Sequence, residues 1–391
     1  MAKAIQRDGA ERNRAAFLKY VEGREAKAVH EQEAKRIANA TWTLFGESRT
    51  NEVSGGCART CYRYFFVEKV DILWYIWAKA KLGVGFMNTL LKQIVADCGH
   101  YASQGHVAQY IPQLAVMDPN KIGIYVISNN GESFYVGDCF DRFTMQSVVK
   151  PLILLLALMD SGIEKVRALV GVEATGKPFD AFNYSDQALT GAHINPMINT
   201  GAIALCTLID GDSYDLKFAR LLELSRKLAG NNNLEVDEFV YLSEKETGNK
   251  NRALSYMLKA YGLIHDPVED ILDCYFKACS ILVNCMDLAQ IANVFAHHGM
   301  NPATGVQIFP KEYARYVNAT LATCGMYDGS GEFALNVGFP AKSGVGGGIM
   351  GVIPNRMGIG VFAPALDKRG NSVAGVQMLI KLSQAMDLSI Y

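Results

Sequence analysis

The chain has 391 residues, of which 50% are hydrophobic and 20% are charged, with a formal net charge of -1 at pH 7. This composition is typical of a globular enzyme with a large core, and the length allows one large domain or two ordinary ones. A near-neutral chain without a basic stripe gives no electrostatic reason to expect a nucleic-acid partner.

The nine cysteines are scattered without a repeated spacing, which predicts reduced thiols in the cytoplasm. His297 and His298 have no carboxylate or cysteine at ligand spacing, so we expect no metal site, and no cofactor is expected either.

The first hundred residues are expected to form a helical N-terminal extension, to which no role is assigned. Residues 1 to about 50 are rich in Ala, Glu, Lys and Arg, and residues 49–56 have the composition of a linker. Residues 65–87 are long enough to cross a membrane, but the five charges within them favour a packed helix, with a surface-bound amphipathic helix as the alternative. The N-terminus has no apolar run, so a secretory signal is not predicted.

At residue 122 the hydrophobic period changes to two. Residues 122–127, a Ser-Asn-Asn-Gly turn and residues 133–136 predict a β-hairpin. Residues of about 150–325 then have helical periodicity, with Gly and Asn breaks at 230–233 and 299–302.

The C-terminal part returns to strands before a closing helix. Short strands are predicted at 333–337, 341–344, 348–353 and 357–363, and the helix at 373–387. Strands at both ends of a helical middle predict an α+β fold, in which helices cover an antiparallel sheet and residues of about 150–325 form a large helical insertion.

Ser147 and Lys150 are three residues apart, which places a hydroxyl and an amine on the same face of a helix. A buried, partly unprotonated lysine can take the serine proton and make the hydroxyl a nucleophile. The S-x-x-K pattern is typical of serine acylases of the β-lactamase and penicillin-binding type, although so short a pattern also arises by chance.

Other polar residues occur in patterns that packing does not require. Asn195 and Asn199 flank a proline, and their amides can offer donors to a carboxylate. Glu244 and Asn251 are two helical turns apart, so we expect them to share one face of a helix. Each also has an ordinary interpretation, since Asn195 can cap a turn and Glu244 can belong to a solvated charged face.

Two segments near the C-terminus are also unusual. Tyr327 lies in a predicted turn, and the glycine-rich residues 342–348 let backbone N–H groups approach a ligand closely. This segment is not a phosphate-binding loop, because no Gly-Lys-Ser/Thr follows and strand-like residues come next. Tyr275, on an apolar helix, is by itself an ordinary core tyrosine.

Together these segments resemble the serine-dependent glutaminases. The resemblance runs from residue 105 to residue 375, with motifs in the family's order, and the run from Pro340 to Ile349 is the most specific. Lys150-Pro151-Leu152 resembles the animal-type members, although no ankyrin repeats follow. The resemblance implies a β-lactamase-like catalytic domain at 101–391 that hydrolyses L-glutamine to L-glutamate and ammonia.

The resemblance also implies a role for each matching residue. Ser147 would be the nucleophile, Lys150 its base, and Tyr275 and Tyr327 would assist proton transfer. The N–H groups of Ser147 and Val345 would form an oxyanion hole. The rest of the substrate pocket would comprise Tyr110 as a lining residue, Asn199 and Asn251 for the α-carboxylate, and Glu244 for the α-ammonium.

The sequence departs from the family mildly, with Glu173-Ala-Thr-Gly176, Thr200 and Lys250 in place of the usual residues. We expect residues 176–192 to form a mobile lid. Family members form tetramers and some form filaments, so a homotetramer is expected, while phosphate activation is left open. The alternatives are another acylase on the same fold, or a non-enzymatic scaffold built on a decayed glutaminase.

Overall fold

The computed structural model describes residues 85–176, 178, 180 and 194–391. The predicted linker and the 65–84 part of the apolar stretch therefore lie outside the described residues, as does most of the predicted lid. The described residues from 85 onward lie in one compact unit, Ala78–Tyr391.

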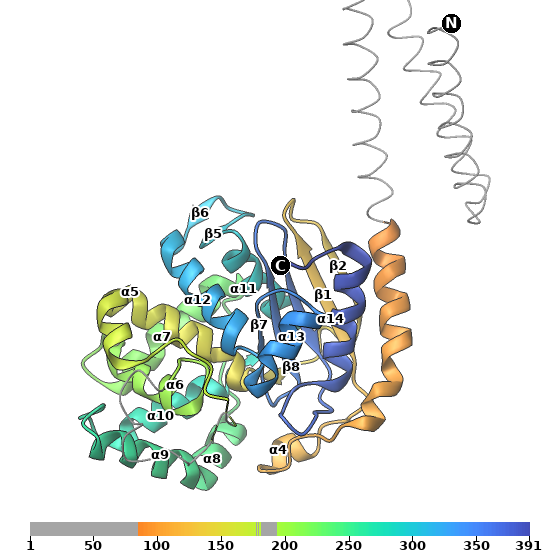
Figure 1. Cartoon of the computed structure of the whole chain (residues 1–391). Coiled ribbons are helices and arrows are strands. Elements are labelled where there is room, and N and C mark those ends of the chain that lie inside the picture. The colour runs from red at the N-terminus through yellow and green to blue at the C-terminus, as the bar shows by residue number, and fades with distance from the viewer. Residues whose placement is uncertain (1–84, 177, 179, 181–193) are drawn as a thin grey trace, which may run out of the picture. The chain divides into compact units, whose positions relative to one another are not determined.

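One half of this unit is built on a five-stranded antiparallel sheet with the strand order β2-β1-β9-β8-β7 (Figure 1). The strands are β1 (Gly123–Ser128), β2 (Ser133–Gly137), β7 (Ala341–Ser343), β8 (Gly348–Ile353) and β9 (Met357–Phe362). β9, near the C-terminus, lies between β1 and β8, so the sheet joins two segments that the helical middle separates in sequence.

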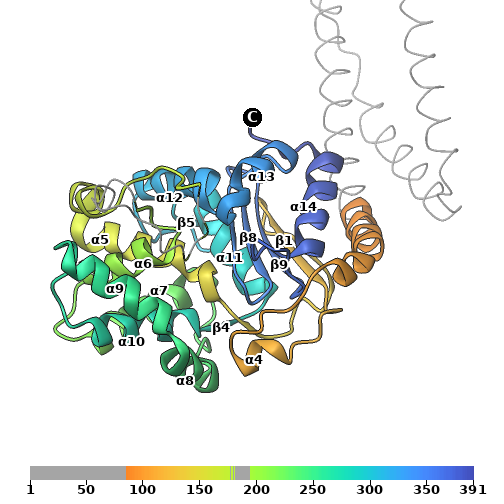
Figure 2. The ribbon, with the colours of Figure 1, turned by 60° about the horizontal axis from the view of Figure 1, so that its bottom comes forward.

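Both faces of the sheet are buried except at the edge strand β2, where alternate residues such as Tyr135 are exposed. Along β1, Tyr125 and Ile127 belong to one core cluster, whereas Ile124 and Val126 belong to another, as the period of two requires. α11 (Cys285–Ala296) covers the first face, and α14 (Val373–Met386) and the helix over residues 85–98 cover the second (Figure 2). Burial on both faces explains why β8 and β9 are buried at every position.

Helices form the other half of the unit, as Figure 1 shows. They are α5 (Lys150–Leu169), α6 (Asn199–Leu205), α7 (Tyr214–Ala229), α8 (Glu238–Thr247), α9 (Asn249–Ala260), α10 (Val268–Cys279) and α12 (Lys311–Cys324). The smaller elements are α4 (Pro112–Ala115), α13 (Ser330–Asn336) and the strand pairs β3 (Phe143–Thr144) with β4 (Leu282–Val283) and β5 (Met300–Asn301) with β6 (Val306–Gln307). The predicted break at Gly230 is confirmed, since α7 ends there in a left-handed residue that only glycine adopts without strain.

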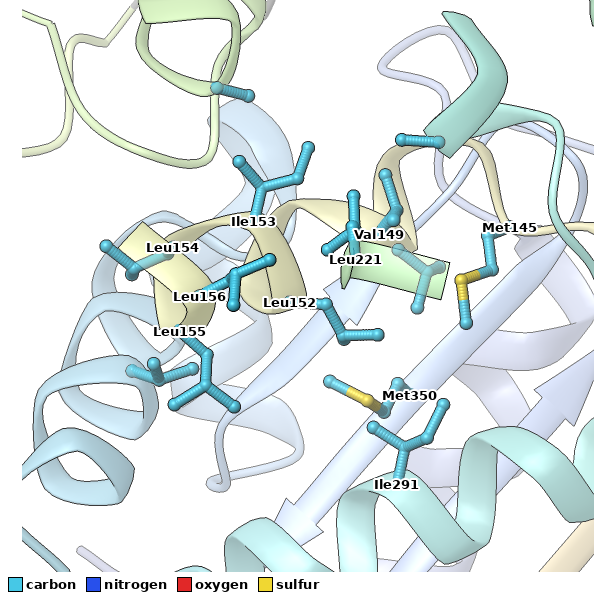
Figure 3. Close-up of a cluster of buried hydrophobic side chains, with 14 of the residues drawn as sticks. Met145, Val149, Leu152, Ile153, Leu154, Leu155, Leu156, Leu221, Ile291 and Met350 are labelled. Atoms are coloured by element: carbon cyan, nitrogen blue, oxygen red, sulfur yellow. The ribbon is translucent and has the colours of Figure 1, made fainter. Parts of the chain in front are cut away.

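The start of α5 connects the two halves. Its residues from Lys150 to Leu158 are all buried. Figure 3 shows Leu152 packed close to Ile291 of α11 and Met350 of β8. Among the described residues, the stretch Gln146–Leu169 is long and apolar enough to cross a membrane, but 72% of its most apolar window is buried within the protein. Its first part, Lys150–Leu158, is therefore a core helix that protein surrounds, whereas Glu164 and Lys165 further along are exposed.

The α+β prediction is confirmed, as are the hairpin, the strands β7 to β9 and the closing helix. The strand predicted at 333–337 is wrong, because these residues belong to α13 and its C-cap. Phe333 packs edge-on against Phe339 in the sheet core, while Leu335 is 85% exposed. A run of five residues is too short for its period to separate one helical turn from a strand.

Candidate active site

Ser147 and Lys150 meet at the junction of two helical segments. Ser147 lies on a 3₁₀ turn, η2 (Gln146–Val149), which runs directly into α5 at Lys150. Side chains three residues apart eclipse each other in a 3₁₀ helix, which brings this pair together. Lys150 Nζ donates a hydrogen bond of 2.6 Å to Ser147 Oγ, and both residues are buried.

The surroundings of Lys150 favour its neutral form. Complete burial lowers the pKa of the amine to about 8, although the carboxylate of Glu244 opposes this shift. A free lysine amine has a pKa near 10.4, so burial brings the unprotonated base within reach of neutral pH.

Asn199 connects three of the predicted site residues. Its Oδ1 accepts hydrogen bonds from Lys150 Nζ at 2.9 Å and from the Tyr275 hydroxyl at 3.3 Å. Its Nδ2 donates to Asn251 Oδ1 at 2.9 Å. Asn199 is the first residue of α6, whereas Lys150 is the first of α5, Asn251 lies on α9 and Tyr275 on α10, so four helices meet at one amide. Burial raises the pKa of Tyr275, which keeps its phenol protonated.

Glu244, on α8, is a buried carboxylate. Burial raises its pKa, whereas hydrogen bonds from Tyr110 and Gln146 and the charge of Lys150 lower it. The Tyr110 hydroxyl donates to Glu244 Oε1 at 2.7 Å, although about half of the Tyr110 side chain is exposed. Tyr110 thus has an exposed ring and an inward-facing hydroxyl, as expected at the rim of a pocket.

The prediction that Glu244 and Asn251 share one helix face is wrong. α8 ends at Thr247 and α9 begins at Asn249, with Gly248 between them. A Cβ atom on Gly248 would lie 2.4 Å from Phe276 Cζ and 2.6 Å from the Glu244 carbonyl oxygen. The break therefore lets the chain turn tightly against α10, and two helices, rather than one, present these side chains.

Tyr327 approaches the nucleophile from the sheet half. It opens the 3₁₀ turn η5 (Tyr327–Gly329) with a positive φ of 54°. Burial raises the pKa of its phenol, and an interaction with the Ser147 side chain opposes this shift. Few non-glycine residues adopt this backbone conformation, and they concentrate at functional sites.

The glycine-rich loop between β7 and β8 lies directly against the turn that carries Ser147. A Cβ atom on Gly344 would lie 2.7 Å from the Met145 carbonyl oxygen and 3.0 Å from Val148 Cγ2. Val345, the next residue, packs on the small apolar cluster of Ile111, Leu114 and Val240. Only a residue without a side chain allows this approach, and it brings the backbone of residues 344–345 beside the nucleophile.

Gln146 was not recognised from the sequence. Its Oε1 accepts from the Tyr110 hydroxyl at 3.2 Å, and its amide hydrogen-bonds the carboxylate of Glu244. Like Tyr327, it has a positive φ, here 48°. Its position directly before the nucleophile was the one available signal. Asn195, in contrast, is structural, since it caps the turn at Met197 and donates to the Glu173 carbonyl.

The glutaminase family model matches residues 105–391 of the chain. The chain belongs to the glutaminase family. Glutaminases from Clostridium tetani (strain Massachusetts / E88) and Clostridium botulinum (strain Kyoto / Type A2) are both 48% identical to it over 305 residues. Each match covers 78% of this chain and 100% of the relative.

Solved structures of glutaminases share the fold. A probable glutaminase from Bacillus subtilis, complexed with 6-diazo-5-oxo-L-norleucine, is 36% identical, with a TM-score of 0.70 over 76% of this chain and 94% of that one. The covalent complex of the Bacillus subtilis glutaminase YbgJ with 5-oxo-L-norleucine is 35% identical, with a TM-score of 0.72 over 78% and 99%. This glutaminase therefore has the β-lactamase-like fold that the sequence predicted and is an amidohydrolase.

Proposed function

We propose that this glutaminase hydrolyses L-glutamine to L-glutamate and ammonia through an acyl-enzyme on Ser147. The observation that carries the proposal is the hydrogen bond of 2.6 Å between the buried Lys150 amine and the Ser147 hydroxyl. The family supports the overall reaction, and the geometry supports the assignment of its steps.

In the first step, neutral Lys150 takes the proton of Ser147 while Oγ attacks the side-chain amide carbon of glutamine. The carbonyl oxygen becomes an oxyanion, which the N–H groups of Ser147 and Val345 would stabilise. One such donor typically contributes about 3 kcal/mol. The close approach of Gly344 to the Ser147 turn supports this role for the loop.

In the second step, the carbon–nitrogen bond breaks and the nitrogen leaves as ammonia, which requires a proton from a nearby acid. Protonated Lys150 supplies it, with the phenols of Tyr327 and Tyr275 as relays. The Tyr327 phenol interacts with the Ser147 side chain, and Tyr275 is linked to Lys150 through Asn199. Water then attacks the ester carbon and gives a proton to the same base. The base returns the proton to Ser147 Oγ as the ester bond breaks, which releases glutamate and the free hydroxyl.

The remaining polar residues suit the head group of an amino acid. Glu244 would bind the α-ammonium, and Tyr110 and Gln146 hold its carboxylate in place. Asn199 and Asn251 would bind the α-carboxylate through their amide N–H groups. One anion and several neutral donors at fixed positions match a zwitterion, and they distinguish this pocket from that of a general acylase.

The test is covalent trapping with 6-diazo-5-oxo-L-norleucine, read by intact mass and peptide mapping. We expect one adduct on Ser147 in the wild-type chain and none in Ser147→Ala. The variant should also keep less than about a thousandth of the wild-type kcat, because loss of an acylating nucleophile costs more than that. An adduct at another residue would overturn the nucleophile assignment.

We further propose that the chain forms a cytoplasmic homotetramer, in which a catalytic domain that includes residues 101–391 follows an N-terminal extension. Relatives that match 305 residues over their whole length support an independent catalytic domain. Met87, Leu91, Ile94 and Cys98 are buried in the core beneath the sheet, so the domain's packing begins before residue 101. Light scattering at several protein concentrations would determine the assembly and reveal a filament if one forms.

A further inference from the structure

A second buried lysine borders the site and has no part in the steps above. Lys342 lies in the middle of β7, opposite Met350 of β8, and is fully buried. Its Nζ donates to the Ser343 carbonyl oxygen at 2.6 Å and lies 4.4 Å from the centroid of the Tyr327 ring. Among the described residues no carboxylate pairs with it, because every salt bridge found there involves other lysines and arginines.

A buried amine without an anionic partner reduces the stability of a protein. A methionine or leucine would fill the same volume without that cost. Packing alone therefore does not account for a lysine at this position. Three groups face it: the Tyr327 ring of η5, the Cys324 thiol of α12, and the Lys150 amine at the start of α5. Burial and the neighbouring Lys150 charge both lower the pKa of the Lys342 amine.

Within the described part of the chain, Lys342 contacts the ring of Tyr327, whose phenol interacts with the Ser147 side chain. An amine over the face of a tyrosine ring attracts the ring, through an N–H contact when it is neutral and more strongly when it is charged. The hydrogen bond to Ser343 fixes the amine on the rigid β7 strand. Tyr327 needs such a restraint, because its backbone φ of 54° is unfavourable for a residue with a side chain.

We propose that Lys342 is a positioning residue, which holds the Tyr327 ring so that its hydroxyl stays against Ser147. It acts on catalysis through Tyr327 and touches neither substrate nor the reacting atoms. This inference rests on the proposed role of Tyr327 in proton transfer. A lysine that only stabilised the fold would affect Tm and leave turnover per folded site unchanged.

Double-mutant cycles separate these two roles, since residues that act together give non-additive effects. The variants are Tyr327→Phe, Lys342→Met and the double variant. Each kcat is divided by the number of sites that 6-diazo-5-oxo-L-norleucine labels, so that only folded sites are counted. We expect Tyr327→Phe to lower kcat by about 100-fold, within the usual range for a general acid. Lys342→Met should lower kcat by about tenfold with KM changed less than about threefold, and the double variant should match Tyr327→Phe within about twofold.

Lys217 provides a matched control away from the site. It is also buried, donates to the Thr207 carbonyl oxygen at 3.1 Å, and lies 4.7 Å from the centroid of the Tyr214 ring. Lys217→Met should leave kcat per labelled site unchanged, whatever its effect on Tm. If Lys342→Met does not fold, the same cycle is run with Lys342→Gln, whose amide can keep the hydrogen bond to Ser343.

The outcomes separate a failure of the Lys342 inference from a failure of the proposed role of Tyr327 on which it rests. A wild-type kcat in Tyr327→Phe would overturn the role of Tyr327 and leave nothing for Lys342 to position. A large Tyr327→Phe effect with a double variant slower by the product of the two single effects would overturn the inference alone. A Lys342 variant with wild-type kcat per labelled site would overturn it as well.

Discussion

At the scale of single residues, the protonation of Lys150 controls the reactivity of Ser147. The amine must be neutral to take the serine proton, and its pKa of about 8 results from burial at the start of α5. The neighbouring phenols stay protonated, because burial raises the pKa values of Tyr275 and Tyr327.

These pKa shifts predict that kcat rises with pH and shows a single ionisation below pH 9. As pH rises through about 8, Lys150 loses its proton, so kcat should increase about tenfold per unit below this value and then level off. The phenols give no falling limb near their ordinary pKa of about 10. Initial rates from pH 6 to 9.5, with ammonia detected directly, test this. A kcat independent of pH from 6 to 8 would contradict the assignment of Lys150 as the base.

Glu244→Gln should weaken substrate binding more than it slows acylation. The substitution removes the buried carboxylate that is proposed to bind the α-ammonium and keeps the side-chain length. A charged hydrogen bond contributes about 1.5–3 kcal/mol, so KM for glutamine should rise by roughly 10- to 100-fold. Turnover of a small ester without an α-ammonium should change little, and equal losses on both substrates would refute the ammonium-binding role.

The sequence predicted the site residues that carry a recognisable motif. Ser147 and Lys150 could be paired because a spacing of three residues has one geometric meaning on a helix. Gln146 and Lys342 could not be assigned, because a sequence does not show a positive φ or the burial of an amine over a ring.

At the scale of elements, glycines determine which segments can approach the nucleophile. The loop between β7 and β8 reaches the Ser147 turn because Gly344 has no Cβ atom. The strand period and the glycine content of the sequence predicted this loop. Its contact with Met145 could not be predicted, because that contact depends on the tertiary fold.

Gly344→Ala should disrupt the oxyanion hole. The added methyl group would lie 2.7 Å from the Met145 carbonyl oxygen, so the loop must move away from Ser147. Loss of one oxyanion donor lowers kcat by about 100- to 1000-fold, and overpacking costs about 1–3 kcal/mol of stability. Gly331→Ala is the control, since no atom lies within 4 Å of its added Cβ. Similar kinetics for the two variants would contradict this role of the loop.

The two incorrect predictions also belong to this scale. A pattern of apolar residues defines neither where a helix stops nor whether a short segment is helical, so the break at Gly248 and the seven-residue helix α13 were both missed. In each case a tertiary contact decides the local structure, with Phe276 against Gly248 and Phe339 against Phe333.

At the scale of the whole molecule, the fold could be predicted because strands at both ends enclosed a helical middle. The residue at which the domain begins could not be predicted. Residues before 101 carried no family motif, yet the helix over residues 85–98 buries four side chains against the sheet core.

Two truncations test where the folded domain begins. A chain that starts at residue 85 should keep the wild-type kcat, because it retains every described core contact. A chain that starts at residue 101 loses Met87, Leu91 and Ile94 from the core, at about 1.5–3 kcal/mol for each large apolar side chain. Its Tm should fall by well over 10 °C or it should be insoluble. Equal Tm values for the two chains would show that this helix is not part of the domain.

The place of β9 in the sheet has a consequence for synthesis of the chain. β1 leaves the ribosome about 230 residues before the strand that completes its pairing. At a synthesis rate of 5–20 residues per second, the apolar edge of β1 stays unpaired for roughly 10–50 s. During that time the hairpin of β1 and β2 offers an unpaired edge to other nascent chains. We therefore expect yield of soluble protein to depend strongly on chaperones and on translation rate, even though the finished sheet is buried on both faces.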